Sequence, residues 1–170
     1  MKKFILALSC GIGLSLAAAA QTAAPKFGYI SSQELLSIMP DVVKADTQLK
    51  VYAKQYTDQL ETMGREFEKK AEDYQKNAAT MTEAVREVKE KELTDLRGRF
   101  QGLEQSANEK VAKKKEELYK PILDKADKAI KAVAAENGYD SVFDASGGML
   151  LYAKDSDNIL PKVKTKLGIK

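Results

Sequence analysis

The chain contains no histidine and no tryptophan, one cysteine and only four prolines among its 170 residues. Without histidine the commonest general base is missing, and the usual zinc sites need histidine or several cysteines. The single cysteine, Cys10, has no second cysteine for an internal disulfide. These absences argue against an enzyme. We therefore expect no catalytic residue, no cofactor and no metal site.

The first twenty residues have the layout of a secretory signal peptide. Lys2 and Lys3 precede an apolar run over residues 4–16, and small residues follow at 17–20. This order of charged, apolar and small residues is typical of signal peptides. The run is shorter than the roughly 20 residues that a membrane-spanning helix needs. We predict that residues 1–20 are removed, Cys10 with them, and that the protein is exported to the periplasm.

The charges of the chain are nearly balanced. It has 28 basic and 25 acidic residues, and removal of Lys2 and Lys3 would leave 26 basic against 25 acidic. Nucleic-acid-binding surfaces are strongly basic. We therefore expect no nucleic-acid partner.

No proline interrupts the chain between Pro40 and Pro121. Because a proline costs about 3 kcal/mol inside a helix, this window permits two very long helices. The segment Thr80–Glu83 has the spacing of a capping box and begins the second helix. We predict an antiparallel helical hairpin over residues 41–121, an arm whose tip lies near residues 77–82.

Apolar residues recur at steps of three and four along both predicted helices, as expected for one helix face. A stripe this narrow predicts the seam between two helices. The remaining faces carry mixed charges, which usually means solvated surface. The stripe includes Leu49, Tyr52, Tyr56, Leu60, Met63, Phe67, Tyr74 and Met81 on the first helix, and Val85, Val88, Leu93, Leu96, Phe100, Leu103, Ala107, Val111 and Leu118 on the second.

A turn centred near residue 80 or 81 determines which residues of the two helices face each other. It places Pro40 opposite Pro121, and Gly64 opposite Gly98. Glycine and proline both weaken a helix. We therefore predict a hinge at each of these two levels of the arm.

The two ends of the chain, residues 21–40 and 122–170, form a small body with strands and short helices. Residues 26–30 alternate like a strand, and Ser31 with Glu34 forms a capping box for a short helix. The fold class is therefore α+β and mostly helical.

The body continues after Asn137–Gly138, a typical helix terminator. Residues 140–145 and 149–153 are predicted as a β-hairpin closed by 146–148. A last helix follows, with Pro161 in its first turn and Gly168 at its end.

Three strands with few apolar residues are too little for an independent core, and oligomerisation is the usual remedy. Three copies of a three-stranded sheet would close a barrel without exposed edges. The residues themselves indicate an oligomer and leave its number open. We assign these aromatic and aliphatic residues to the body core and the subunit interface: Phe27, Tyr29, Val142, Phe143, Leu150 and Tyr152.

Several segments together resemble the Skp (OmpH) family of periplasmic chaperones over essentially the whole chain after residue 20. They are Lys-Phe-Gly-Tyr-Ile-Ser-Ser-Gln-Glu-Leu-Leu from Lys26, the charged hairpin, Tyr-Lys-Pro-Ile from Tyr119, and Glu-Asn-Gly-Tyr-Asp-Ser-Val-Phe-Asp-Ala-Ser-Gly-Gly from Glu136, with Met-Leu-Leu-Tyr from Met149. The block from Glu136 is fairly specific because it directly follows a long helix. The hairpin alone would resemble any charged antiparallel coil.

The resemblance implies a jellyfish-like homotrimer, in which three helical arms leave a small β body and surround a cavity. It also implies ATP-independent binding of unfolded outer-membrane proteins until they are inserted. Family members are described as strongly basic on the arms, which suits lipid headgroups. Here residues 69–91 carry six basic and five acidic side chains. Contact with a membrane surface therefore stays open, with little charge to support it.

Candidate client contacts lie on the arm, where aromatic and methionine side chains adapt to many partners. They are Tyr52, Tyr56, Tyr74, Met81 and Tyr119. The same residues also suit the seam of the hairpin. A structural coiled-coil adaptor of an envelope assembly is the alternative function, and it would need no holdase activity.

Overall fold

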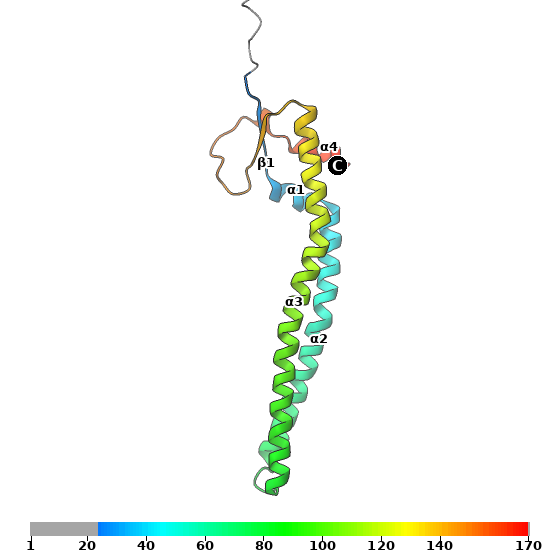
Figure 1. The fold of residues 1–170 in the computed structure, drawn as a ribbon, viewed down its shortest axis with the longest axis vertical. Coiled ribbons are helices and arrows are strands. Elements are labelled where there is room, and N and C mark those ends of the chain that lie inside the picture. The colour runs from blue at the N-terminus through cyan, green and yellow to red at the C-terminus, as the bar shows by residue number, and fades with distance from the viewer. Residues whose placement is uncertain (1–23, 170) are drawn as a thin grey trace, which may run out of the picture.

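The computed structural model describes residues 24–169, so the predicted signal peptide over 1–20 lies outside the described residues. Two long antiparallel helices form an arm, and the other elements gather at one end as a small body (Figure 1). In chain order the elements are β1 (Phe27–Ile30), α1 (Ser32–Ile38), α2 (Pro40–Asn77), α3 (Glu83–Glu136), β2 (Ser141–Asp144), the short 3₁₀ helix η1 (Asp155–Asp157) and α4 (Leu160–Leu167). The mostly helical α+β fold with a long hairpin is confirmed.

Met39 separates α1 from α2 because the next residue is proline. The backbone of Met39 is extended, at φ −75° and ψ 121°, as the residue before a proline prefers. Pro40 then lies in the first turn of α2, where its missing N–H costs nothing. Pro40 therefore starts the arm.

The turn of the hairpin occupies residues 78–82, between the end of α2 and the start of α3. The Thr82 side chain caps α3 by accepting a hydrogen bond from the Val85 N–H at 3.4 Å. The predicted cap, Thr80, instead donates its hydroxyl to the Asn77 carbonyl at 2.9 Å. The predicted cap at Thr80 is therefore wrong by two residues, because Thr80 lies in the turn and bonds back to the last residue of α2.

The register of the hairpin differs from the prediction at the base of the arm. Lys125 Nζ lies 2.7 Å from Asp41 Oδ2, whereas the prediction placed residue 41 level with 120. Tyr119 likewise donates to Asp46, about one helical turn from its predicted partner. Pro40 is therefore not level with Pro121. Packing along the whole seam determines the register, and the centre of the turn alone does not.

The two strands pair in parallel, with Phe27 opposite Ser141 and Ile30 opposite Asp144. The other edge of β1 is also used, since the Ile159 N–H donates to the Tyr29 carbonyl at 2.9 Å. The predicted second strand of the β-hairpin, residues 149–153, is irregular. The Ser146 hydroxyl accepts from the Gln33 N–H at 2.9 Å, so the chain turns toward α1 instead of folding back along β2.

The body has a core of its own, built mainly from helices. Leu35 of α1 and Val163 of α4 are fully buried, and small residues of α3 such as Ala126 let these helices approach closely. The prediction that one chain cannot close a core overlooked the C-terminal half of α3, which runs into the body. The core comprises Ile30, Leu35, Met39, Ala45, Ile122, Ala126, Ala129, Val133, Ile159, Leu160 and Val163.

Both predicted helix ends in the body are confirmed. Asn137 is the C-cap of α3 and is followed by Gly138 at φ 65°. Gly168 ends α4 at φ 70°, a left-handed conformation that costs glycine little. These turns bring β2 and the C-terminus back onto α3.

Candidate functional site

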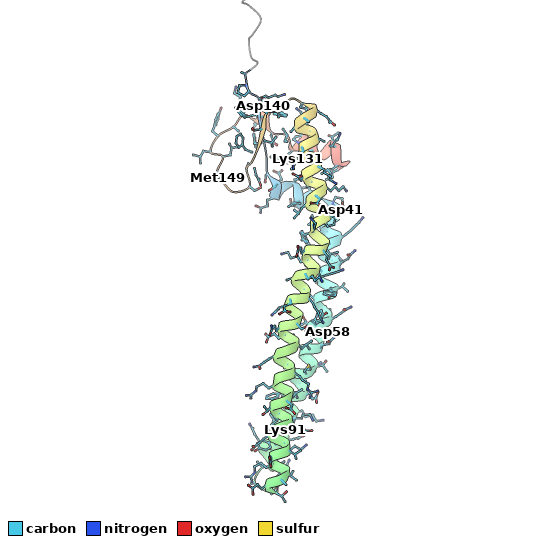
Figure 2. All side chains as sticks on the ribbon, in the orientation of Figure 1. Asp41, Asp58, Lys91, Lys131, Asp140 and Met149 are labelled. Carbon is cyan, nitrogen blue, oxygen red and sulfur yellow. The ribbon has the colours of Figure 1, made fainter. Side chains whose placement is uncertain are left out.

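Several apolar side chains of the arm are exposed and lie outside the seam between its two helices. Val43 and Val51 on α2 are 61% and 58% exposed, and Val88 on α3 is 61% exposed. Val85 and Leu123 on α3 are also largely exposed. Side chains extend from the arm along its whole length (Figure 2). The arm therefore offers apolar contacts that are dispersed along its length.

Val85 and Val88 were predicted to lie in the seam, and the structure leaves them exposed. The reason is local, because α2 ends at Asn77 and the Tyr74 hydroxyl already reaches Glu90 of α3. The first turns of α3 thus extend past the α2 residues that would cover them. The sequence analysis did not predict that these two valines are exposed, although the end of the partner helix before the turn was a usable signal.

Tyr52 and Tyr56 do come together, and they lie half-buried on the side of α2 that faces α3. Their rings pack edge to face with centroids 5.4 Å apart, and their hydroxyls lie 3.2 Å apart. Lys110 of α3 places Nζ 5.8 Å from the Tyr56 ring centroid. The hydrogen bond to Tyr56 raises the pKa of Tyr52. This pair belongs to the seam as well as to the candidate contacts.

Tyr74 and Tyr119 each join the two helices of the arm. Tyr74 donates its hydroxyl to Glu90, and Tyr119 donates to Asp46. The hydrogen bond to a carboxylate raises the pKa of each phenol, because ionisation would place two negative charges side by side. Both tyrosines are therefore half-buried parts of the arm structure.

Met81 lies in the turn, half-buried, and its N–H donates to the Asn77 carbonyl at 3.2 Å. It stands next to the exposed tip residues of α3. Of the five predicted client contacts, it is the one placed in the turn at the tip.

The predicted body residues divide into two groups. Tyr29, Val142 and Leu150 are half-buried, and Val142 packs against the core. Phe27 and Phe143 are 49% and 51% exposed, with ring centroids 6.0 Å apart, and Tyr152 is 83% exposed. Phe27, Phe143 and Tyr152 thus lie outside the core of one chain, which forms around α1, α3 and α4, and their assignment to the subunit interface stays a prediction.

Met149 and Leu151 are the most exposed large apolar residues of the described chain, at 89% and 95%. They lie with Leu150 and Tyr152 in the irregular segment after β2, which projects from the body (Figures 1 and 2). We call residues 149–152 the apolar segment.

Pro121 lies inside α3, which continues through it to Glu136. Gly64 and Gly98 also lie within unbroken helices, and an added Cβ at either position would have open space around it. Pro121, Gly64 and Gly98 thus fall in regular helix, whereas Pro40 lies at the break between α1 and α2. Motion at these positions stays a prediction.

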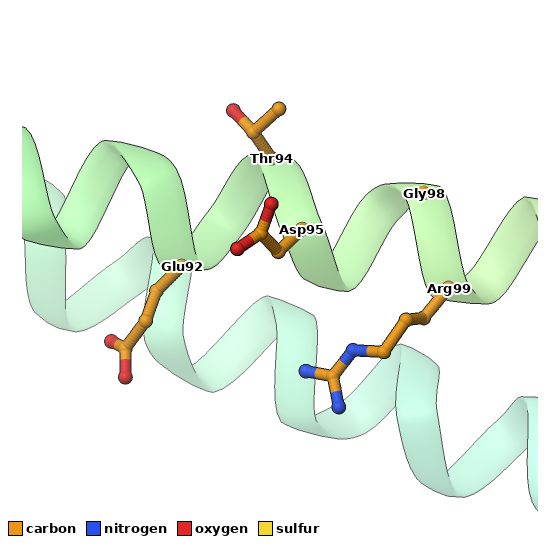
Figure 3. A pocket seen from close by; sticks show the side chains of 5 residues that line it. All are labelled: Glu92, Thr94, Asp95, Gly98 and Arg99. Carbon is orange, nitrogen blue, oxygen red and sulfur yellow. The ribbon is translucent and has the colours of Figure 1, made fainter.

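A shallow depression on α3 surrounds Gly98 and is lined by Glu92, Thr94, Asp95 and Arg99 (Figure 3). All five residues belong to α3, and the side chains of Thr94 and Glu92 point in opposite directions in Figure 3. Within residues 24–169 no group of three or more acidic, histidine or cysteine side chains is arranged to hold a metal ion. No described helix is long and apolar enough to cross a membrane.

Ion pairs along the arm join mostly residues three or four apart on one helix, such as Lys54 with Asp58 at 2.6 Å. Pairs between the helices occur near both ends of the arm, with Lys70 Nζ 3.6 Å from Glu92 and Lys125 2.7 Å from Asp41. Exposed pairs of this kind contribute little stability. The charged faces are therefore solvated surface, as the sequence indicated.

Comparison with known proteins agrees with this architecture. The family model described as outer membrane protein (OmpH-like) matches residues 26–167. The chain is 31% identical over 163 residues to the chaperone protein Skp of Photorhabdus luminescens, covering 96% of this chain and 97% of the relative. It is 29% identical over 170 residues to the chaperone protein Skp of Vibrio cholerae, covering 96% and 97%.

The fold also matches a solved structure. The crystal structure of a putative outer membrane chaperone (OmpH-like) from Caulobacter crescentus superposes with a TM-score of 0.72, covering 85% of each chain at 17% identity. At that identity the likeness concerns the fold alone. The family match over nearly all described residues carries the assignment: this chain belongs to the OmpH-like family of outer membrane proteins, the family that the segments from Lys26 and Glu136 resemble.

Proposed function

We propose that this protein is an ATP-independent periplasmic holdase chaperone, which binds unfolded outer-membrane proteins and prevents their aggregation until membrane insertion. The observation that carries the proposal is the set of exposed apolar side chains on a long arm, in a chain whose relatives are named as Skp chaperones. The exposed apolar residues of the arm include Val43, Val51, Val85 and Val88.

Dispersed weak contacts suit an unfolded client better than one deep site. An unfolded barrel protein exposes apolar side chains at alternate positions, so it can meet the arm at many places. Each contact contributes little, and no covalent or nucleotide chemistry is needed for binding or release. Tyr52, Tyr56, Tyr74, Met81 and Tyr119 remain proposed contacts beside the exposed valines.

The cavity for the client requires more than one arm, and we propose a homotrimer. The apolar segment, residues 149–152, places exposed apolar side chains next to one another, and exposed apolar patches mark sites of protein association. Phe27 and Phe143 form a further exposed aromatic pair on the sheet. Pairing of these surfaces between subunits would cover them and protect the free edge of β2.

Movement of the arms would adapt the cavity to clients of different size. Gly64 and Gly98 weaken the two helices in the middle of the arm, and Pro121 removes one backbone donor from α3 near its base. Pro40 marks the entry to the arm. We propose softening at these positions, now without the requirement that the two prolines share one level.

Apolar contact should dominate over charge in client binding. The tip carries nearly equal numbers of basic and acidic residues, six and five over residues 69–91. Electrostatic steering and attraction to anionic lipid headgroups are therefore weak in this proposal. Export through removal of residues 1–20 would place the chain where such clients pass.

The proposal is tested with an unfolded outer-membrane protein that contains tryptophan. This chain has none, so the client's emission reports binding directly, and light scattering reports aggregation. At stoichiometric amounts of the assembled protein we expect aggregation to be suppressed in the absence of nucleotide. Undiminished aggregation together with no change in emission would contradict the holdase function and favour a structural adaptor.

A further inference from the structure

The first turn of α1 is held by side chains from the far end of the chain. The Ser32 N–H donates to Asp144 Oδ1 at 3.1 Å, and the Ser32 hydroxyl donates to Asp144 Oδ2 at 2.5 Å. The Gln33 N–H donates to the Ser146 hydroxyl at 2.9 Å. Only the Glu34 N–H is capped locally, by Ser31 at 3.1 Å. Two of the three backbone N–H groups thus donate to residues more than 110 positions away.

Asp144 also holds its own loop. Its Oδ1 atom accepts a second hydrogen bond, from the Ser146 N–H at 2.9 Å. The Ser146 hydroxyl lies 3.1 Å from that of Ser32. The carboxylate therefore bonds α1 on one side and the loop after β2 on the other. The hydrogen bonds from Ser32 and Ser146 stabilise the ionised acid and hold the pKa of Asp144 far below its ordinary value.

This group, Ser32, Asp144 and Ser146, lies between the apolar segment and the start of the arm, and we call it the clamp. Beyond Ser146 the loop leads directly into the apolar segment, residues 149–152. On the other side, α1 has only seven residues, is anchored by the buried Leu35, and passes through Met39 into α2. α1 therefore ties the loop after β2 to the start of α2, in addition to the continuous helix α3, which also runs from the arm into the body core.

We infer that Asp144 and Ser146 are positioning residues that couple the apolar segment to the direction of the arm. With the clamp intact, the start of α1 and the loop after β2 keep one arrangement, which narrows the range of directions that the softer positions allow the arm to take. Loss of the clamp frees the start of α1 while its buried residues remain packed. The inference depends on the proposed function in one respect: it takes the apolar segment to be a contact between subunits.

The variants are Asp144→Asn and Ser146→Ala, and the matched control is Asp140→Asn. Asp140 directly precedes the other end of β2, and its Oδ2 atom accepts a hydrogen bond from the Lys26 N–H at 2.6 Å, away from α1. Ser146→Ala keeps the carboxylate and removes the bond to Gln33, so it remains informative if Asp144→Asn does not fold.

Hydrogen exchange measures the clamp itself. Loss of a bond to a charged acceptor should speed exchange of the Ser32, Gln33 and Ser146 amides about tenfold in Asp144→Asn, and that of Gln33 in Ser146→Ala. Asp140→Asn should leave these three amides unchanged. Unchanged exchange in both clamp variants would overturn the inference.

Distances within one chain measure the coupling. Spin labels at Ala79→Cys in the tip and Ser156→Cys in η1 report the orientation of the arm against the body, with labelled chains diluted into unlabelled ones. We expect a broader distance distribution in both clamp variants and the wild-type distribution in the control. If amide exchange became faster while the distance distribution stayed unchanged, the clamp would stabilise only its own surroundings. That result would overturn the coupling between the clamp and the arm.

Failure of the proposed function gives a different result. A monomeric wild-type protein, or one that does not suppress aggregation, would refute the holdase proposal while both clamp measurements remain readable. The distance pair lies within one chain and does not depend on assembly.

Discussion

Tyrosine hydroxyls hold the two helices of the arm together at both of its ends. Tyr74 donates to Glu90 near the tip, and Tyr119 donates to Asp46 near the base. Each bond needs a protonated phenol. At the residue scale, the arm is therefore sensitive to alkaline pH.

We predict that the arm loses stability as the pH rises above about 10, the ordinary pKa of tyrosine. A folded-state pKa that is raised contributes stability below the unfolded pKa, and this contribution disappears as the pH passes the folded value. Thermal unfolding at neutral and alkaline pH measures the effect. The double variant Tyr74→Phe and Tyr119→Phe should be less stable at neutral pH and less dependent on alkaline pH.

The exposed Tyr152 supplies the control for that prediction. Tyr152→Phe should leave both the stability and its alkaline dependence as in the wild type. An equal loss of alkaline dependence in this variant would contradict the role of the two inter-helix bonds.

Gly28 in β1 is required by the close approach of its neighbours. An added Cβ would lie 3.0 Å from Tyr139 Cε1 and 3.1 Å from Ile159 Cγ2. Gly28→Ala should therefore destabilise the body by about 1–3 kcal/mol, the usual cost of overpacking. Denaturant unfolding measures the loss, and a variant as stable as the wild type would mean that Tyr139 moves aside freely.

At the scale of elements, the arm has one face that is packed and others that are free. Leu96 is 1% exposed in the seam, whereas Val85 and Val88 on the same helix are open to solvent. Burial follows from the partner helix, which ends at Asn77. The tip is thus an apolar surface carried by a stable helix.

We predict that Val85→Ser combined with Val88→Ser weakens binding of an unfolded client. Exposed valines contribute little to folding, so the thermal stability of the arm should change only slightly. Client tryptophan emission measures the affinity. Gln101→Ser, at an exposed position of α3 outside the tip, is the control and should bind as the wild type does.

Gly64 and Gly98 give a second prediction about the elements. Alanine at either position has room and removes the entropic cost of glycine, so each change should stabilise its helix by about 1 kcal/mol. If these positions are hinges, Gly64→Ala with Gly98→Ala should also lower the capacity for large clients and spare small ones. A stabilised arm with an unchanged client range would remove the hinge from the proposal.

At the scale of the whole molecule, the body combines a closed helical core with uncovered apolar residues. Val163 and Ile159 are fully buried, while Met149 and Leu151 are almost fully exposed. One chain can thus fold its core and still present a surface for association. This division explains how the proposed trimer would form from subunits that already have structure.

We predict a solution mass of three chains for the wild type and of one chain for the triple variant Met149→Ser, Leu151→Ser and Tyr152→Ser. The variant should keep its helical content, because these side chains are outside the core. Light scattering after size-exclusion chromatography measures the mass, and circular dichroism checks the fold. An unchanged mass of the variant would place the subunit interface elsewhere.

Much of the fold was predictable because local rules acted alone. Pro40 and Gly168 sit at helix ends for steric reasons that hold in any protein. The irregular course of residues 149–153 was not predictable from the sequence, because it depends on the bond by which Ser146 holds the loop against α1. The exposure of Phe143 was not predictable either, because it depends on which helices form the core.

The sequence by itself determined the length of the arm, its seam, most of the helix ends and the family of the chain. These follow from spacing and from proline and glycine, which act within a few residues. Only the tertiary structure decided the register at Asp41 and Lys125, the exposure of the tip valines, and the clamp between Asp144 and the start of α1. Such contacts join residues far apart in the chain, and their geometry arises only when the whole molecule is packed.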